Sequence, residues 1–193
     1  MIIRKLFKFE NAHIVRKCTS RRCRESIHGH SYKTEIFLES NFLDNGHMVY
    51  DFGLMKSYIK DLIDSFDHSI SIWNGDKSEY ISDMQKYSER WILLPVSPSA
   101  EQLSRIIFVL IDSFFKSNKM INGEKGVKLQ SVIVHETDTG YAQCFREDAY
   151  SENMGKIELS EIIFSKDIIS DWKDINLFEN LKSGKPFANP KTL

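Results

Sequence analysis

The chain has 193 residues, of which 41% are apolar, 12% aromatic and 27% charged, and these fractions are those of an ordinary globular domain. Its 26 Lys and Arg against 27 Asp and Glu give a formal net charge of −1, which argues against a general electrostatic attraction to nucleic acid or to an anionic membrane. The length predicts one domain with room for an appendage, large enough to fold without a disulfide framework.

The sequence predicts a cytoplasmic protein with no membrane span. Charged residues are mixed into the first ten positions, so we expect no signal peptide. The longest apolar run, 106–111, is too short to cross a bilayer. Cys18, Cys23 and Cys144 are an odd count without a secretion signal, so we expect free thiols in a reducing compartment.

The first forty residues predict two strands separated by a loop. Residues 2–12 are rich in Ile, Leu and Phe and indicate a strand. Residues 14–27 carry five Arg or Lys side chains without apolar periodicity, which is typical of a loop. Residues 30–39 alternate between apolar and charged side chains, so we expect a strand with one buried face.

A turn and a helix are predicted next. Asp44-Asn45-Gly46 is a turn signal, and residues 48–50 predict the returning strand of a hairpin. Asp51 is a candidate cap for a helix over about 52–65, where apolar residues recur at helical spacing.

The second half of the chain predicts a helix and a further hairpin. Residues 75–94 are polar and irregular and indicate an insertion between structural elements. A Ser-x-x-Gln capping box at 99–102 predicts the start of an apolar helix over about 100–116. Residues 128–137 and 141–146 predict two strands joined by a tight turn. Hairpins on both sides of two helices favour the α+β class, with helices on one face of an antiparallel sheet.

The C-terminal segment is too apolar for a disordered tail. It predicts a helix within 165–182 that packs on the body or on another subunit, followed by a loose end over 183–193.

Three histidines are candidates for a metal site. His28 and His30 flank a glycine at the start of a strand, and alternate residues of a strand point to the same side. His13 at the end of the preceding strand can supply a third nitrogen. Zinc with three protein ligands keeps a fourth position for water or substrate, as in catalytic sites. The alternative is a surface turn with unrelated histidines.

Two thiols compete for a chemical role. Cys23 lies five residues before His28, and a thiolate near positive charge can accept a proton or attack an electrophile. Cys18 lies in the same basic loop and is a rival on charge alone. The alternative for either is an exposed thiol with no role.

Two carboxylates are candidates for roles in catalysis or substrate binding. Asp67 precedes His68, and a carboxylate beside an imidazole can orient it as a proton carrier; the alternative is a charge interaction at a helix end. Glu136 lies near the end of an apolar strand, where it could accept two N–H bonds from a planar heterocycle or could simply face water.

Six segments occur in a fixed order along the chain: F-E-N-A-H (9–13), C-x4-H-G-H-S-Y (23–32), M-V-Y-D-F-G-L-M-K (48–56), F-D-H-S-I-S-I-W-N (66–74), P-S-A-E (98–101) and V-I-V-H-E-T (132–137). In this order they resemble the 6-pyruvoyl-tetrahydropterin synthase/QueD family, in which QueD is 6-carboxy-5,6,7,8-tetrahydropterin synthase. Together they cover about residues 3–146, so the match is far more specific than one histidine motif.

The resemblance implies the tunnelling fold, a four-stranded antiparallel sheet with two helices on one face. Subunits are expected to close their sheets into a barrel as a trimer or hexamer, which removes exposed sheet edges. It also implies one zinc ion per subunit. The residues carried over are His13, His28 and His30 as zinc ligands, Cys23 as the catalytic thiol, Asp67 and His68 as the proton relay, Glu136 as the pterin anchor, and Ser99 and Glu101 as residues that hold the pterin or position the relay.

The implied reaction converts 7,8-dihydroneopterin triphosphate to 6-carboxy-5,6,7,8-tetrahydropterin with release of acetaldehyde and triphosphate, in queuosine (7-deazapurine) biosynthesis. The alternatives are the 6-pyruvoyl-tetrahydropterin synthase reaction and a non-catalytic zinc- or pterin-binding module. We expect a small-molecule pterin substrate, with neither nucleic acid nor membrane as a partner. The basic loop over 16–24 either binds the triphosphate or is a solvated charge run.

Some positions depart from the family pattern. Four residues separate the cysteine from His-Gly-His, between the three usual in queuosine enzymes and the five usual in pyruvoyl synthases, so this spacing does not choose the branch. Glu25 leaves open a side activity, because related folate-bypass enzymes use a glutamate near this position. We therefore expect a catalytic domain over 1–148, with the insertion at about 75–94, and an extension over 149–193 that packs on the core or on a neighbouring subunit.

Overall fold

A computed structural model of the chain describes residues 1–190 and 192. The strands are β1 (Ile2–His13), β2 (His28–Glu39), β3 (Ser69–Trp73), β4 (Trp91–Leu94), β5 (Asn118–Lys119), β6 (Lys128–His135), β7 (Tyr141–Phe145), β8 (Ile163–Phe164) and β9 (Phe187–Ala188). The α-helices are α1 (Arg21–Glu25), α2 (Tyr58–Asp64), α3 (Ser78–Tyr87), α4 (Ala100–Ser117), α5 (Arg146–Ala149), α6 (Lys166–Asp171) and α7 (Leu177–Ser183). Among the residues described, no helix has the length and apolarity that crossing a membrane requires.

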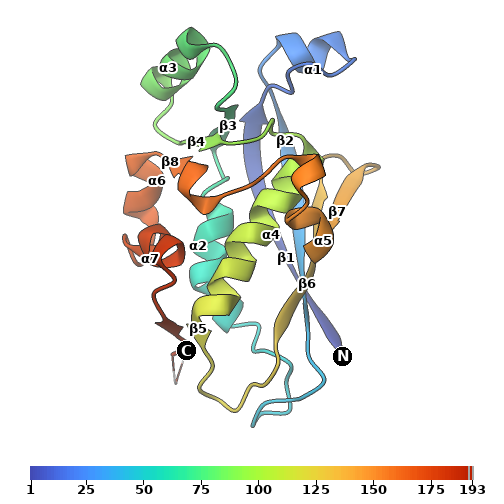
Figure 1. Cartoon of the computed structure of the whole chain (residues 1–193), viewed down its shortest axis with the longest axis vertical. Coiled ribbons are helices and arrows are strands. Elements are labelled where there is room, and N and C mark those ends of the chain that lie inside the picture. The colour runs from blue at the N-terminus through green and yellow to red at the C-terminus, as the bar shows by residue number, and fades with distance from the viewer. Residues whose placement is uncertain (191, 193) are drawn as a thin grey trace.

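The strands form a mixed sheet of order β7-β6-β2-β1-β3-β4-β8 (Figure 1). Its first four strands are antiparallel, as expected, and β1 pairs with β2 from Ile2 opposite Glu39 to His13 opposite His28. The expectation of a sheet with only four strands was wrong, because β3 and β4 extend it in parallel to β1 and β8 closes that edge. The added strands have two to five residues, too few to show a clear alternation.

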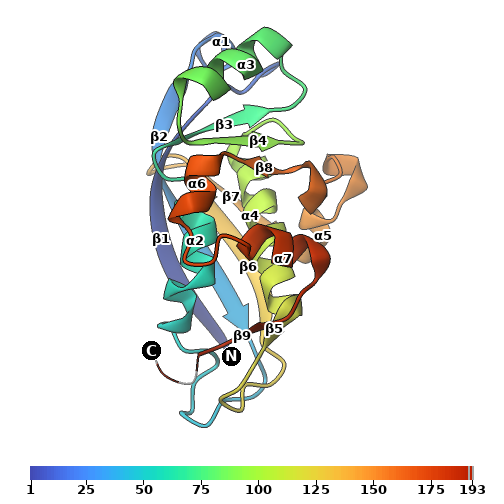
Figure 2. The same cartoon turned by 90° about the vertical axis from the view of Figure 1, so that its left-hand side faces the viewer.

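The core lies between the long strands and the helices α2 and α4 (Figures 1 and 2). Tyr32, Thr34, Ile36 and Leu38, the alternate residues of β2, have no exposed surface. Full burial of one large apolar side chain contributes about 1.5–3 kcal/mol. This face therefore fixes the register of β2, because a shift by one residue would expose all four side chains.

The expected strand over 48–50 is absent from the structure. Asp44 Oδ1 accepts the backbone N–H groups of Gly46 and Met48, each at 2.8 Å, so the side chain satisfies amides that a sheet would otherwise use. Val49 and Tyr50 are nevertheless buried. Their apolar character reflects core packing without strand pairing.

The helix expected over 52–65 is interrupted. Residues Leu54–Lys56 form a 3-10 turn and α2 begins at Tyr58, with the break at Ser57. Asp51 Oδ1 accepts the N–H of Gly53 at 2.7 Å and so begins the short turn, not α2. The apolar spacing continues across the break, so the pattern could not reveal it.

The segment over 75–94 is regular, which corrects the expectation of an irregular insertion. It contains α3 and β4, and β3-α3-β4 is a parallel crossover unit. The helix predicted over 100–116 is α4, and Ser99 Oγ accepts the N–H of Gln102 at 3.4 Å. The capping box is only half formed, because the Gln102 side chain donates to the carbonyl of Met154.

The C-terminal segment contains two short helices, α6 and α7, in place of one. Trp172 and Phe178 pack with Phe164 of β8, at ring-centroid distances of 5.2 and 4.9 Å from it. The end is not loose up to Asn189, because β9 pairs with β5 and Asn189 is buried. Residues 191 and 193 lie outside the described residues, and the division of the chain at residue 148 stays a prediction.

Candidate metal centre and active-site cleft

Three imidazoles converge where β1 ends and β2 begins. The antiparallel register places His13 opposite His28, and His30 follows on the same face. One ring nitrogen from each of them lies within 4.8 Å of the others. The ring centroids are 4.5 Å apart for His13 and His28 and 5.3 Å for the other two pairs. We call these residues the His triad.

Backbone carbonyls orient two of the rings. His13 Nδ1 donates to the Pro98 carbonyl at 2.5 Å and His28 Nδ1 to the Ser26 carbonyl at 3.0 Å. A ring that donates through Nδ1 presents an unprotonated Nε2, and such outer contacts are typical of metal-binding histidines. Burial lowers the pKa of His13 to about 4, against the opposing effect of the Pro98 bond and with the help of His28 and His30. His13 is therefore neutral at pH 7, as a metal ligand must be.

A carboxylate and a phenol adjoin the His triad. Glu136 Oε1 lies 3.7 Å from His13 Nε2 and 3.8 Å from His30 Nε2, and the side chain is 32% exposed. The Tyr32 hydroxyl lies 3.3 Å from His13 Nδ1. Burial, together with the nearby Glu136, raises the pKa of Tyr32, so its hydroxyl keeps its proton at any physiological pH.

A cleft of about 540 Å³ opens beside these groups, and we call it the site cleft. Cys23 reaches it from α1, and Glu136 from the end of β6. Cys18 lines the same cleft, so position alone does not decide between the two thiols. The expected site residues that line it are Cys23, His28, His30, Ser99, Glu101 and Glu136.

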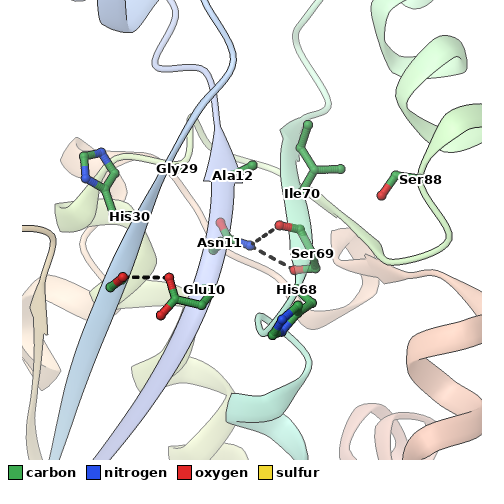
Figure 3. A pocket seen from close by; sticks show the side chains of 10 residues that line it. Glu10, Asn11, Ala12, Gly29, His30, His68, Ser69, Ile70 and Ser88 are labelled. Carbon is green, nitrogen blue, oxygen red and sulfur yellow. Dashed lines mark hydrogen bonds between the residues drawn. The ribbon is translucent and has the colours of Figure 1, made fainter.

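The Asp67–His68 pair lies elsewhere, between α2 and β3. His68 Nδ1 is 2.9 Å from Asp67 Oδ2, and Asp67 Oδ1 accepts the N–H of Glu10 at 2.7 Å. His68 lines two cavities, of about 510 and 300 Å³, and Cys23 is in the lining of neither. His30 of the His triad also lines the larger one; in Figure 3 it lies beside β2, and His68 lies on the far side of β1, next to β3.

Sequence reasoning missed several groups that shape these sites. The carbonyls of Pro98 and Ser26 carry no sequence signal, because any residue has a carbonyl. Tyr32 belongs to the strand expected over 30–39, and the alternation of that strand accounts for its burial without pointing to a place in the site. Arg90, which contacts the segment before His68, lay in the region taken as irregular.

The α+β fold thus brings together three histidines that could hold a metal ion, and a thiol and a carboxylate line the cleft beside them. The family model described as 6-pyruvoyl tetrahydropterin synthase matches residues 2–147. The chain belongs to this family, which makes it a pterin-synthase-type lyase.

Two curated relatives are both named 6-carboxy-5,6,7,8-tetrahydropterin synthase. The one from Helicobacter pylori strain J99 is 35% identical over 184 residues, covering 95% of this chain and 92% of the relative. The one from Haemophilus influenzae is 27% identical over 151 residues, covering 73% of this chain and 96% of the relative. The H. pylori protein therefore also matches most of the C-terminal segment.

Solved structures support the fold. An uncharacterized protein from Wolinella succinogenes superimposes with a TM-score of 0.58 at 22% identity, over 76% of this chain and 98% of that one. The 6-pyruvoyl tetrahydropterin synthase of Caenorhabditis elegans gives 0.52 at 19% identity, over 75% and 94%. The expected α+β tunnelling fold is confirmed, with the sheet extended as described above.

Proposed function

We propose that this protein converts 7,8-dihydroneopterin triphosphate and one water molecule to 6-carboxy-5,6,7,8-tetrahydropterin, acetaldehyde and triphosphate, as a step of queuosine (7-deazapurine) biosynthesis. The names of the curated relatives support this product. The observation that carries the proposal is the convergence of three histidine nitrogens within 4.8 Å beside a cleft lined by Cys23 and Glu136. The three free cysteines fit the reducing cytoplasm in which we place the protein.

The His triad fits one zinc ion per subunit. His13, His28 and His30 would hold it, since three nitrogen ligands with carbonyl-oriented rings are typical of catalytic zinc sites. When bound, zinc supplies Lewis-acid polarisation of the substrate's side-chain oxygens.

Glu136 is the proposed anchor of the pterin ring. Its carboxylate is only partly buried and can accept two parallel N–H bonds from the edge of a planar heterocycle. Ser99 and Glu101 line the same cleft at the start of α4. Because Ser99 Oγ also caps α4, its contact with substrate would share the hydroxyl with the helix.

Cys23, as thiolate, moves one proton between the substrate's side chain and its ring, and His68, oriented by Asp67, serves the opposite transfer. Cys23 lines neither cavity beside His68, so we propose that the pair of one subunit completes the site cleft of a neighbour. In the described residues the sheet face opposite α4 carries exposed Ile2, Leu6 and Tyr141 and no helix (Figure 2). Closure of such sheets into a trimeric or hexameric barrel would cover this face.

The basic residues of the loop over 16–24 fall into three groups by their contacts. Arg16 binds Asp76 at 2.7 Å and Lys17 lies over the Trp73 ring, so both side chains turn toward β3 and the segment that follows it. Arg24 donates to carbonyls within its own loop. Arg21 and Arg22 are exposed on α1, and we assign them to the triphosphate.

The test is incubation of the zinc-loaded protein with dihydroneopterin triphosphate, followed by product analysis. Acetaldehyde with a carboxy-pterin is expected. A pyruvoyl-pterin would instead assign the 6-pyruvoyl-tetrahydropterin synthase reaction, and no product would assign a binding module. Cys23→Ala should lose turnover while Cys18→Ala keeps it; the reverse result would transfer the thiol's role to Cys18. Glu25→Gln tests whether the glutamate supports a side reaction.

A further inference from the structure

The turn that presents His68 is strained. We call residues 64–68 the relay turn, because it connects α2 to the Asp67–His68 pair. His68 has φ +50°, in the left-handed region that residues other than glycine rarely adopt. Its side chain is 77% exposed, so its own packing does not maintain this conformation. Such a backbone persists only where surrounding groups determine it.

Arg90 supplies those contacts at both ends of the relay turn. Its Nε donates to the Asp67 carbonyl at 2.9 Å and its Nη2 to the Asp64 carbonyl at 2.8 Å. Asp64 is the last residue of α2, where carbonyls lack intrahelical partners, and the planar guanidinium can serve two acceptors at once. The Arg90 carbonyl in turn accepts the N–H of Ile70 at 3.0 Å, which fixes this residue to β3.

The C-terminal segment holds Arg90 from the other side. Arg90 Nη1 forms an ion pair with Asp171 of α6, and the Arg90 side chain is 20% exposed. Trp172 Nε1 donates to Ser65 Oγ at 2.9 Å within the relay turn itself. The segment over 75–94 and the tail, which lies beyond the family match at 2–147, therefore meet at the relay turn.

We propose that Arg90 is a positioning residue for proton transfer. Its guanidinium, held by Asp171, fixes the relay turn together with the hydrogen bond from Trp172 to Ser65, so that Asp67 and His68 keep their pairing and direction. This inference rests on the proposed function, in which that pair moves a proton. Arg90 acts through backbone carbonyls and does not touch the imidazole.

Electrostatics supports the geometry. Burial alone would raise the pKa of Asp67, but the Glu10 N–H, the His68 ring and the Arg90 charge together hold it below its usual range. Asp67, His68 and Arg90 all line the cavity of about 300 Å³, and the other charged groups around it are Asp61 and Asp64 of α2 and Asp171 of α6. Removal of Arg90 would therefore raise the pKa of Asp67, and the acid limb of the kcat–pH profile would move to higher pH.

The test compares Arg90→Ala and Arg90→Lys in the full-length, zinc-loaded protein. Arg90→Ala should lower kcat by about 10- to 100-fold, because small misplacements of catalytic groups have effects of that size. KM and zinc content should stay unchanged, and the acid limb should move to higher pH. Arg90→Lys should be intermediate, since an ammonium group cannot form the guanidinium fork. Guanidinium at millimolar, non-denaturing concentration should partly restore Arg90→Ala.

Matched variants distinguish an effect of Arg90 on the position of the relay turn from a general loss of protein stability. Asp171→Asn should lower kcat less than Arg90→Ala does. Lys156→Ala, which removes an exposed ion pair with Glu158 elsewhere in the tail, should leave kcat and the pH profile unchanged. If Arg90→Ala fails to fold, Arg90→Lys and Asp171→Asn decide the question through kcat and the pH profile.

The outcomes are distinguishable from failure of the proposed function. If the parent protein has no turnover, the proposed function fails and this inference fails with it. If the parent turns over and His68→Ala abolishes turnover, but Arg90→Ala and Arg90→Lys keep the parental kcat and acid limb, the inference alone is overturned.

Discussion

The His triad and the relay turn are built in different ways. The His triad depends on one antiparallel ladder, in which residues 13 and 28 face each other and residue 30 follows two positions later. The relay turn depends on Arg90, Asp171 and Trp172, which are 22 or more residues away in the chain. Strand register thus brings the three imidazoles together, with carbonyl contacts to orient two of them, whereas the conformation of the relay turn depends on side chains from distant segments.

The largest expected effect tests the His triad. His28→Ala should reduce zinc affinity by more than the about 10- to 100-fold that loss of an outer-shell partner costs, with little loss of stability because His28 is half-buried. Metal content after dialysis measures this, with exposed His47→Asn as the matched control. Unchanged metal content in His28→Ala would reject the His triad as the metal site.

The next largest effect is expected for Arg105→Ala, which loosens the tail. It tests whether the relay turn depends on the tail while the His triad does not. Arg105 is buried in α4 and donates to the carbonyls of Asp148, Ala149, Ser151, Met154 and Gly155. Arg105→Ala leaves these acceptors without their donor, so urea unfolding should show a loss of about 3 kcal/mol.

Under conditions where Arg105→Ala remains folded, its zinc affinity should equal that of the parent while its kcat falls. Arg105→Lys, which keeps the charge but reaches fewer carbonyls, should be intermediate. A parallel loss of zinc affinity would show that the His triad also depends on the tail, and the contrast between the two regions would disappear.

A Trp172 variant tests the contrast between the relay turn and the His triad by removing a single hydrogen bond. Trp172→Phe keeps an aromatic ring beside Phe164 but removes the Nε1 donor to Ser65 Oγ. The expected loss is about 1 kcal/mol, the usual net contribution of one hydrogen bond, with lower kcat and parental zinc content. Thermal unfolding and steady-state kinetics measure these quantities. A parental kcat would show that the Trp172 indole does not help to position the relay turn.

Ser99 gives the smallest effect, at the edge of the site cleft. Ser99→Ala removes the cap of α4 and should cost about 1 kcal/mol, whereas Ser99→Gly should cost only a few tenths. If the hydroxyl also contacts the pterin, both variants should raise KM equally despite their different stabilities. A KM that follows stability would indicate that Ser99 serves only as a helix cap.

The parts of the fold that the sequence predicted are those with a regular local period. Alternation in 30–39 predicted β2 and its buried face, and the apolar run after Ser99 predicted α4. β3 and β4 were missed because strands of four or five residues show little periodicity. The strand expected over 48–50 was wrong because an Asp44 side chain, not a neighbouring strand, satisfies the local amides.

For the candidate site, residue order was informative where the ligands lie on adjacent strands. The spacing of His28 and His30 places both on one face of any strand that contains them. No comparable rule relates Arg90 to His68, because the guanidinium binds carbonyls whose positions depend on the end of α2. The roles of Cys23, Glu136 and the Asp67–His68 pair stay predictions until turnover is measured.

The sequence by itself determined the two long strands and a core large enough for one domain, because side-chain alternation is a local property. It also put His13, His28 and His30 at the ends of these strands, so that antiparallel pairing brings them together. Only the tertiary structure decided that 75–94 is a strand–helix extension of the sheet, that the tail packs against the end of α2, and that Cys23 and His68 of one chain line different cavities. Those outcomes depend on long-range burial and on the pairing of backbone carbonyls, which leave no periodic trace in the sequence.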